Sequence, residues 1–211
     1  MQKPGFFLVF ESAAKCGKST LATGLTRYLE SKKHEILHKR GALSNSEFSR
    51  QIKLQNICDL GYSSAFYWAD CIFDTNDTVK PAITSGKFVL QERYDLSILT
   101  FREIHGLKSD FILLDEYLER HLLISPDLTV LLKADPRSVL NRIRNSADSS
   151  EIDLIFLSRP DLVTAMNERL EYHLNRLGRK YITLDTVANT VSDCQQKIIS
   201  VLQEYGDNYE K

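Results

Sequence analysis

Gly17, Lys18, Ser19 and Thr20 close the stretch FFLVFESAAKCGKST, and residues of these types in this order can hold a phosphate group. A glycine lets the backbone approach an anion closely, a lysine reaches the terminal phosphates of a nucleotide, and a serine hydroxyl binds magnesium. The full pattern, G-x-x-x-x-G-K-[ST], has a glycine where this chain has Ser12. Serine reaches some glycine backbone angles only at a cost, which favours an ordinary turn over a phosphate loop, although the change removes no N–H donor.

The elements on either side of this loop are the ones that a phosphate site requires. The apolar run Phe6–Phe10 is typical of a buried strand, and Leu21, Leu25, Tyr28 and Leu29 share one face of the following helical segment. The N-terminus of such a helix carries a partial positive charge that favours anions. The loop residues expected to contact a nucleotide are Ser12, Ala13, Ala14, Lys15, Cys16, Gly17, Lys18, Ser19 and Thr20. The alternative is an ordinary strand-to-helix turn in which Lys18 is solvated.

A second chemically useful pair, Glu92 and Arg93, follows the apolar run Phe88–Gln91. Ligands of open parallel sheets bind at the carboxyl ends of the strands, where a carboxylate such as Glu92 can orient magnesium or its waters. The planar guanidinium of Arg93 suits a phosphate group. The alternative interpretation is a salt bridge at the edge of the sheet.

Short apolar runs alternate with helical patterns along the whole chain, which predicts an α/β fold. The candidate strands are Phe6–Phe10, Ile36–His38, Phe88–Gln91, Leu128–Leu132 and Tyr181–Leu184. Between them, Asp135-Pro136 is typical of a helix start, and Gly178 ends a long apolar stripe. We therefore expect a three-layer sandwich in which a five-stranded parallel sheet lies between helices.

Composition restricts the classes of partner. The 211 residues are enough for a single domain, residues 1–211, and a formal charge of −1 argues against nucleic acid as the main ligand. Cys16, Cys58, Cys71 and Cys194 are too scattered for a zinc site or a disulfide scaffold, which favours the reducing cytoplasm. The opening apolar run is too short for a membrane span or a signal core, so we expect no membrane partner.

Two polar stretches interrupt the alternation of strand and helix patterns, and we expect both to be mobile loops. They are RGALSNSE, from Arg40, and RNSADSSEID, from Arg144, both rich in Ser, Asn and Asp. Either stretch can serve as a lid.

Three motifs together resemble the thymidylate kinase branch of the nucleoside monophosphate kinases. FESAAKCGKST resembles the family's F-E-G-x-D-x-x-G-K-[ST], and PAITSGKFVLQERYDLS resembles its P-A-L-x-x-G-x-x-V-[IVL]-x-D-R-[YF]-x-x-S. PDLTVLLKADPRSVLNRI resembles P-D-L-x-x-x-L-x-x-x-P-x-x-x-x-x-R-[IL], and YITLDT lies where the closing strand is expected. The likeness covers nearly the whole length.

The resemblance implies a P-loop kinase fold, ATP and Mg²⁺ as cofactors, a homodimer, and a small helical lid at about residues 144–160. It implies that Ser19 and Glu92 bind the metal and that Arg142 closes over the triphosphate, with Arg144 as a second lid arginine. The implied catalytic residues are Lys15, Lys18, Glu92, Arg93 and Arg142. The implied acceptor residues are Arg40, Phe66, Tyr67, Asp70, Arg93, Tyr94, Ser97 and Arg102, with the ring of Tyr67 stacking on the base.

The acceptor half departs from the family pattern more than the ATP half does. In this chain Ala14 stands where the family has an aspartate, and Cys71 stands where it has an arginine. Lys39-Arg40-Gly41 replaces the family's R-E-P turn, and Arg102 falls near the position of the family's pocket glutamine. Glu92 replaces the usual aspartate, and glutamate at that position is more typical of deoxyribonucleoside kinases, where it would serve as a base. Phosphoryl transfer from ATP to thymidylate is therefore the leading hypothesis. The alternatives are a deoxyribonucleoside kinase and a nucleotide-binding relic without turnover.

Overall fold

The structure is a computed structural model that describes residues 5–41, 60–104, 121–148 and 150–209. Its centre is a five-stranded parallel sheet in the order β2-β3-β1-β4-β5. The strands are β1 (Phe6–Glu11), β2 (Ile36–Arg40), β3 (Phe88–Glu92), β4 (Leu128–Lys133) and β5 (Tyr181–Asp185). The predicted α/β class is confirmed, and each strand runs one or two residues further than its apolar pattern indicated.

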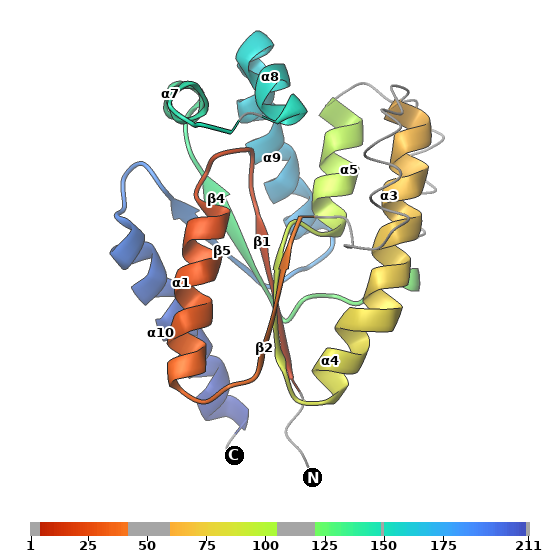
Figure 1. Cartoon of the computed structure of the whole chain (residues 1–211), viewed down its shortest axis with the longest axis vertical. Helices are drawn as coiled ribbons and strands as arrows, with labels where there is room; N and C mark the ends of the chain where they lie inside the picture. Colours follow the sequence, from red (N-terminus) through yellow and green to blue (C-terminus); the bar gives the residue numbers. More distant parts are fainter. Residues whose placement is uncertain (1–4, 42–59, 105–120, 149, 210–211) are drawn as a thin grey trace.

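Helices cover both faces of the sheet, as Figure 1 shows with the sheet seen nearly edge-on. One layer holds α1 (Lys18–Ser31) and α10 (Val191–Tyr209), which pack against each other. The other holds α3 (Leu60–Asp74), the π-helical turn η1 (Thr75–Val79), α4 (Lys80–Thr84), α5 (Asp95–Ile104) and α9 (Asp161–Arg176). Two short helices, α7 (Pro136–Arg144) and α8 (Glu151–Ser158), lie beyond the carboxyl ends of the strands, above the loop between β1 and α1.

Burial is deepest at the centre of the sheet and falls off at its edges. Every residue of β1 is buried, and the ring of Phe7 packs edge-on against Tyr94 at 5.2 Å between centroids. Strands β2 and β5 are only partly buried. The prediction of strands covered on both faces therefore holds for the central strands, because an outer strand has a neighbour on one side only. None of the helices described reaches the length and apolar character that crossing a bilayer demands.

The predicted helix ends are confirmed, but one predicted loop is partly wrong. Asp135 accepts a hydrogen bond from the Ser138 amide (2.9 Å) at the start of α7, and Gly178, with φ 60°, follows α9. The polar stretch after Arg144 was expected to be a loop throughout, whereas α8 begins within it at Glu151. The reason is a capping box between Ser150 and Asp153, a local signal that outweighs the polar composition. Of the stretch after Arg40, residues 42–47 lie outside the described part of the chain.

A half-buried carboxylate connects α5 to α9. Glu103 Oε2 accepts hydrogen bonds from His173 Nε2 and from Arg169 Nε, each at 2.8 Å. Arg176 approaches the other ring nitrogen of His173 at 3.2 Å, so the imidazole accepts there and carries its proton on Nε2. Burial favours the neutral form of Glu103, but the hydrogen bonds from His173 and Arg169 outweigh it and lower its pKa to about 2.

We expect Glu103→Gln to flatten the loss of stability in acid. Because the folded pKa of Glu103 lies below the ordinary value of 4.5, its ionised form stabilises the fold fully above about pH 4.5, and this contribution is lost as the pH falls towards 2. With screening at the half-exposed Arg169, the variant should lose about 2 kcal/mol of unfolding free energy at pH 7. Urea titrations at pH 7 and pH 3 measure this, and the deficit should shrink by more than half at pH 3. An equal deficit at both pH values would contradict the prediction.

Candidate active site

The loop between β1 and α1 presents backbone N–H groups at the start of a helix. The helical ladder begins with the Leu21 amide, which donates to the Gly17 carbonyl at 3.0 Å, so the amides of Lys18, Ser19 and Thr20 precede it. Gly17 has φ 94°, a left-handed conformation that requires glycine, although a Cβ there would meet open space. This loop can therefore surround an anion with backbone donors.

Ser12 does not carry the strain that its position in the motif predicts. Among the described non-glycine residues, φ is positive at Lys15, Lys33 and Arg93 only. Ser12 is fully buried, and its hydroxyl donates to the Ala13 carbonyl at 2.7 Å. Serine therefore occupies this position without the backbone cost, because it does not enter the left-handed region.

Restoring glycine at this position should therefore have little effect. We expect Ser12→Gly to change the KM for ATP by less than about threefold, since the backbone there does not depend on glycine and the carbonyls that hold Lys18 remain. Steady-state kinetics with varied ATP measures this. A change of about tenfold or more in either direction would mean that the serine side chain shapes the loop.

Lys18 folds back over the loop in this structure. Its ammonium donates to Ser12 Oγ at 2.6 Å and to the Ala13 carbonyl at 2.8 Å, and the residue is 8% exposed. Burial, together with the positive charge of Arg93, lowers the pKa of Lys18 to about 7. A buried ammonium held by neutral oxygens gains more from an arriving anion than a solvated one does.

Glu92 lies at the carboxyl end of β3 and joins three elements. One carboxylate oxygen accepts a hydrogen bond from Ser19 Oγ of α1, and the other accepts from His38 Nε2 of β2 at 2.9 Å. Burial raises the pKa of Glu92, but the hydrogen bonds from His38 and Ser19 outweigh it, so its pKa lies below the ordinary value. The parallel register places Arg40 beside Glu92, with Nε 3.9 Å from the carboxylate.

The Ser19–Glu92 contact suits magnesium better than a metal that needs a cage of protein ligands. In the residues that the structure describes, no group of three or more His, Cys, Asp or Glu side chains is arranged to hold a metal ion. Magnesium keeps several waters and takes one or two protein ligands together with substrate phosphates. A hydroxyl and an ionised carboxylate side by side fit that requirement.

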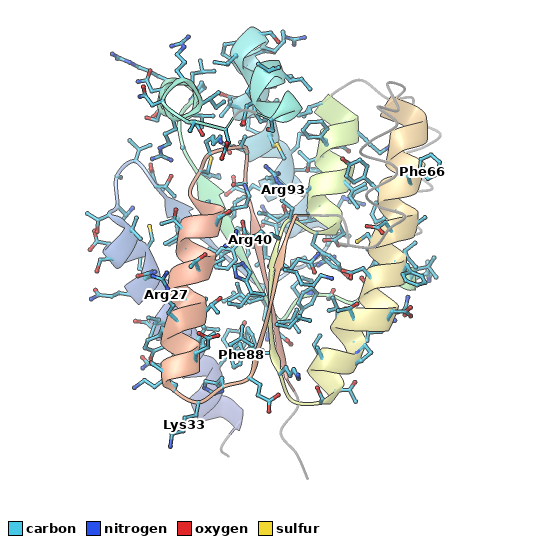
Figure 2. All side chains as sticks on the ribbon, in the orientation of Figure 1. Arg27, Lys33, Arg40, Phe66, Phe88 and Arg93 are labelled. Atoms are coloured by element: carbon cyan, nitrogen blue, oxygen red, sulfur yellow. The ribbon has the colours of Figure 1, made fainter. Side chains whose placement is uncertain are left out.

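Arg93 is held at the next turn in a strained conformation. Its φ is 67°, and its Nη1 donates to the Ser12 carbonyl at 3.0 Å and lies 3.3 Å from Ser97 Oγ. The buried Glu11 fixes the same turn by accepting from the amides of Tyr94 (2.9 Å) and Ser97 (3.2 Å). Burial raises the pKa of Glu11, although hydrogen bonds from the Ser97 hydroxyl and the Tyr94 amide oppose the rise. The guanidinium is therefore aimed at the phosphate loop, and Figure 2 shows Arg93 near the carboxyl ends of the strands.

A cavity of about 320 Å³ adjoins the phosphate loop on the side of α10. Its walls come from the loop, the first turn of α1, α7, the turn after β5 and the start of α10. The lining residues are Lys15, Cys16, Gly17, Thr20, Leu21, Arg142, Thr186, Asn189, Val191 and Cys194. Its size falls in the range of small-molecule sites.

Arg142 closes one side of this cavity and is not at the tip of a loop. Its guanidinium donates to the Thr186 carbonyl (2.7 Å), to Thr186 Oγ1 (3.0 Å) and to the Lys15 carbonyl (3.2 Å). It thus joins the phosphate loop to the turn after β5. Arg144, the other arginine expected in a lid, is exposed at the end of α7.

The predicted acceptor residues on α3 lie on different faces of the helix. Tyr67, Cys71 and Asp74 share one face by their spacing, and Asp74 accepts from the Lys39 ammonium at the end of β2. Phe66 lies with the exposed Ala69 and Phe73, and it projects from the outer side of α3 in Figure 2. The geometry therefore brings Tyr67, and not Phe66, towards the carboxyl edge of the sheet.

Other predicted acceptor residues differ in accessibility. Tyr94 is fully buried, with its hydroxyl 3.0 Å from Thr75 Oγ1, so its side chain packs in the core, and a substrate contact at this residue stays a prediction. Ser97 is buried between Glu11 and Arg93 and positions the arginine. Asp70 and Arg102 are buried on α3 and α5.

Sequence reasoning missed several residues that shape the site. They are Glu11, His38, Asp153, Thr186 and Asn189. Glu11, His38 and Thr186 lie at or just beyond the carboxyl ends of predicted strands, and that position was a usable signal. Asp153 carried only the signal of a capping box.

Comparison with known proteins gives consistent matches. Residues 10–198 match the family described as thymidylate kinase. A probable thymidylate kinase of Thermococcus gammatolerans is 24% identical over 215 residues, which cover 95% of this chain and 97% of that protein. A thymidylate kinase of Desulfotalea psychrophila is 25% identical over 206 residues, covering 95% and 96%. One of Dehalococcoides mccartyi is 32% identical over 146 residues, covering 64% of this chain and 68% of that protein.

Proposed function

We propose, because the chain belongs to the thymidylate kinase family, that it transfers the terminal phosphoryl group of ATP to thymidine monophosphate. The observation that carries this proposal is the meeting of two motifs at one edge of the sheet. Glu92 contacts Ser19, and Arg93 contacts the Ser12 carbonyl, so the acid-arginine pair lies against the phosphate loop. The products would be ADP and thymidine diphosphate.

On the ATP side, the residues of the loop and of the cavity have complementary roles. The backbone donors of residues 12–20 would bind the phosphates, and the cavity beside Arg142 would take the base and ribose. Ser19 and Glu92 would hold Mg²⁺, which would neutralise charge on the phosphates. The segment 144–160, which contains α8, would act as the lid.

The reaction needs no covalent intermediate on the protein. An oxygen of the acceptor phosphate attacks the terminal phosphorus of ATP in line, and the bond to the leaving ADP oxygen breaks. Lys18 and Arg93, both anchored on the loop, would stabilise the charge spread over the transferred group. Positioning by this rigid edge and electrostatic stabilisation would supply most of the rate enhancement.

On the acceptor side, Tyr67 would stack on the thymine base, and Arg93, Arg40 and Arg102 would supply positive charge towards the acceptor. Asp70 would contribute a polar group from the same helix as Tyr67. Phe66 is the weakest member of the predicted set, because it lies on the outer face of α3. The homodimer remains a prediction from the family.

Two alternatives are less well supported. A nucleoside kinase would use Glu92 as a base, yet both Glu92 oxygens already accept from Ser19 and His38. A relic without turnover would explain the changes at Ala14 and Cys71. It would not explain why Lys18, Ser19, Glu92 and Arg93 are gathered at one edge.

A coupled assay that follows ADP release tests the proposal. Purified protein with ATP and Mg²⁺ is given thymidine monophosphate, the other common nucleoside monophosphates, or the nucleosides. We expect turnover with thymidine monophosphate, and loss of that turnover when Mg²⁺ is chelated. Activity on nucleosides alone would overturn the proposal in favour of the Glu92 base. No transfer to any acceptor, together with intact ATP binding, would favour the relic.

A further inference from the structure

Lys15 connects the phosphate loop to the segment above it through both its backbone and its side chain. Its carbonyl accepts from Arg142 Nη1 at 3.2 Å. Its ammonium donates to Ser146 Oγ at 2.9 Å and to the Asp148 carbonyl at 2.8 Å, and it lies 3.5 Å from Asp153 Oδ2. Lys15 is thus not a solvated loop lysine, because these three partners of its ammonium all belong to the 144–160 segment.

The backbone of Lys15 is held in a conformation that a lysine does not adopt by preference. Its φ of 52° lies in the left-handed region, which costs a non-glycine residue about 1–3 kcal/mol and persists only where the surroundings hold it. Contacts at both the carbonyl and the ammonium supply that restraint. The direction of the side chain is therefore determined by α8 and by the residues that connect α7 to it.

Asp153 is the charged partner in this contact, and it has a second task. It lies in the first turn of α8, 2% exposed, where it accepts from the Ser150 amide at 2.8 Å, while its own amide donates to Ser150 Oγ at 3.3 Å. One carboxylate thus starts helix α8 and faces the Lys15 ammonium. An acid used only as a helix cap does not need burial against a lysine from the phosphate loop.

The location of this pair is relevant to the reaction. Figure 1 shows α8 directly above the loop that follows β1. Lys15 also lines the cavity beside Arg142, so this lysine lies between the cavity and the 144–160 segment. Burial lowers the pKa of Arg93, and the negative charge of the nearby Asp153 acts in the opposite direction.

We propose that Asp153 is a positioning residue for phosphoryl transfer that acts through Lys15, an inference that rests on the proposed function. Asp153 keeps the Lys15 ammonium with α8, so that the loop and the 144–160 segment meet the triphosphate as one unit. The ammonium then faces charge that develops on the transferred group, which affects the transition state more than the bound ground state. The effect of losing Asp153 therefore falls mainly on kcat.

Asp153→Asn separates this role from helix capping. The asparagine oxygen still accepts from the Ser150 amide, so the cap remains while the charge that faces Lys15 is lost. We expect kcat to fall about tenfold and the KM for ATP to change less than about twofold. Asp153→Glu, which keeps the charge, should recover most of kcat. Asp161→Asn, which removes an exposed carboxylate paired with Arg159 close by, is the matched control and should leave kcat unchanged.

A double-mutant cycle with Lys15→Gln tests whether Asp153 acts through the lysine. Lys15→Gln alone should lower kcat at least about tenfold, and adding Asp153→Asn should lower it no further. Thermal denaturation establishes that each variant is folded, and calorimetric titration with ATP measures binding without turnover; we expect affinities within about threefold of the parent. If Asp153→Asn misfolds, the cycle is run with Asp153→Gln, which removes the charge from the longer side chain that Asp153→Glu keeps.

The outcomes are distinct. An unchanged kcat in Asp153→Asn would overturn the inference, and so would a tenfold loss of kcat that persists when Asp153→Asn is added to Lys15→Gln. In both cases a fully active parent protein would leave the proposed function standing. If Asp153→Asn lowers the thermal stability without changing kcat, Asp153 serves only as a helix cap, and this result also overturns the inference. An inactive parent protein would overturn the proposed function and this inference with it.

Discussion

Lys18→Ala is expected to lower kcat about 1,000-fold, the scale observed when a preorganised charge is removed from a transition state. In this structure the Lys18 ammonium is buried and held by oxygens of Ser12 and Ala13, which carry no formal charge. A triphosphate offers it a stronger partner, and the low local dielectric increases that interaction. Lys15, the other lysine of the loop, has different partners, Ser146 Oγ and the Asp148 carbonyl, so its ammonium occupies a different position and does not replace that of Lys18.

The coupled assay with ATP and thymidine monophosphate measures this loss. Lys32→Ala is the control, because Lys32 is an exposed lysine at the opposite end of the same helix. Thermal denaturation should show that Lys18→Ala remains folded, since alanine replaces a buried charge and leaves no charged group behind. A kcat within about tenfold of the parent value would remove Lys18 from the catalytic residues.

Arg93→Ala is expected to lower kcat at least about 100-fold, because a single charge-stabilising donor contributes roughly 3–4 kcal/mol in a preorganised site. Its guanidinium is fixed between the Ser12 carbonyl and Ser97, and this turn is itself held by the buried Glu11. A lysine keeps the charge but not the planar pair of donors, so Arg93→Lys should recover only part of the rate.

Arg93→Gly separates the chemistry from the strain. The φ of 67° costs any residue with a Cβ, so glycine should leave the protein about 1 kcal/mol more stable than alanine at the same position. Both variants should lose kcat equally, since neither carries a guanidinium. Kinetics and urea denaturation of the pair measure the two effects independently. A glycine variant that regains activity would show that Arg93 matters for the turn and not for its charge.

The sequence predicted the architecture well because its signals are local. Apolar runs separated by helical periodicity indicated all five strands, and alternation of the two required a parallel sheet with helices on both faces. Helix ends at Asp135 and Gly178 could be predicted because capping depends on neighbouring residues only. The predicted ends of the strands were less accurate. The strands continue into polar residues such as Glu11 and Glu92, which tertiary contacts keep in the sheet.

The acceptor half was harder to predict than the ATP half. A phosphate loop is contiguous, so its residues are found together in the sequence. Acceptor contacts come from separate helices, and which face of α3 points inward depends on what packs against it. That is why Tyr67 and Phe66 were predicted together, although only Tyr67 lies on the face shared with Cys71 and Asp74.

By itself, the sequence determined the order of the elements, the phosphate loop and the acid-arginine pair, because each depends on residues close together in the chain. Only the tertiary structure decided that Glu92 contacts Ser19 and His38, that Glu11 fixes the turn of Arg93, and that Lys15 faces Asp153. These partners are separated by tens of residues or more, up to 138 between Lys15 and Asp153. No local pattern encodes such contacts, because parallel strands and their crossover helices bring distant carboxyl ends to one edge.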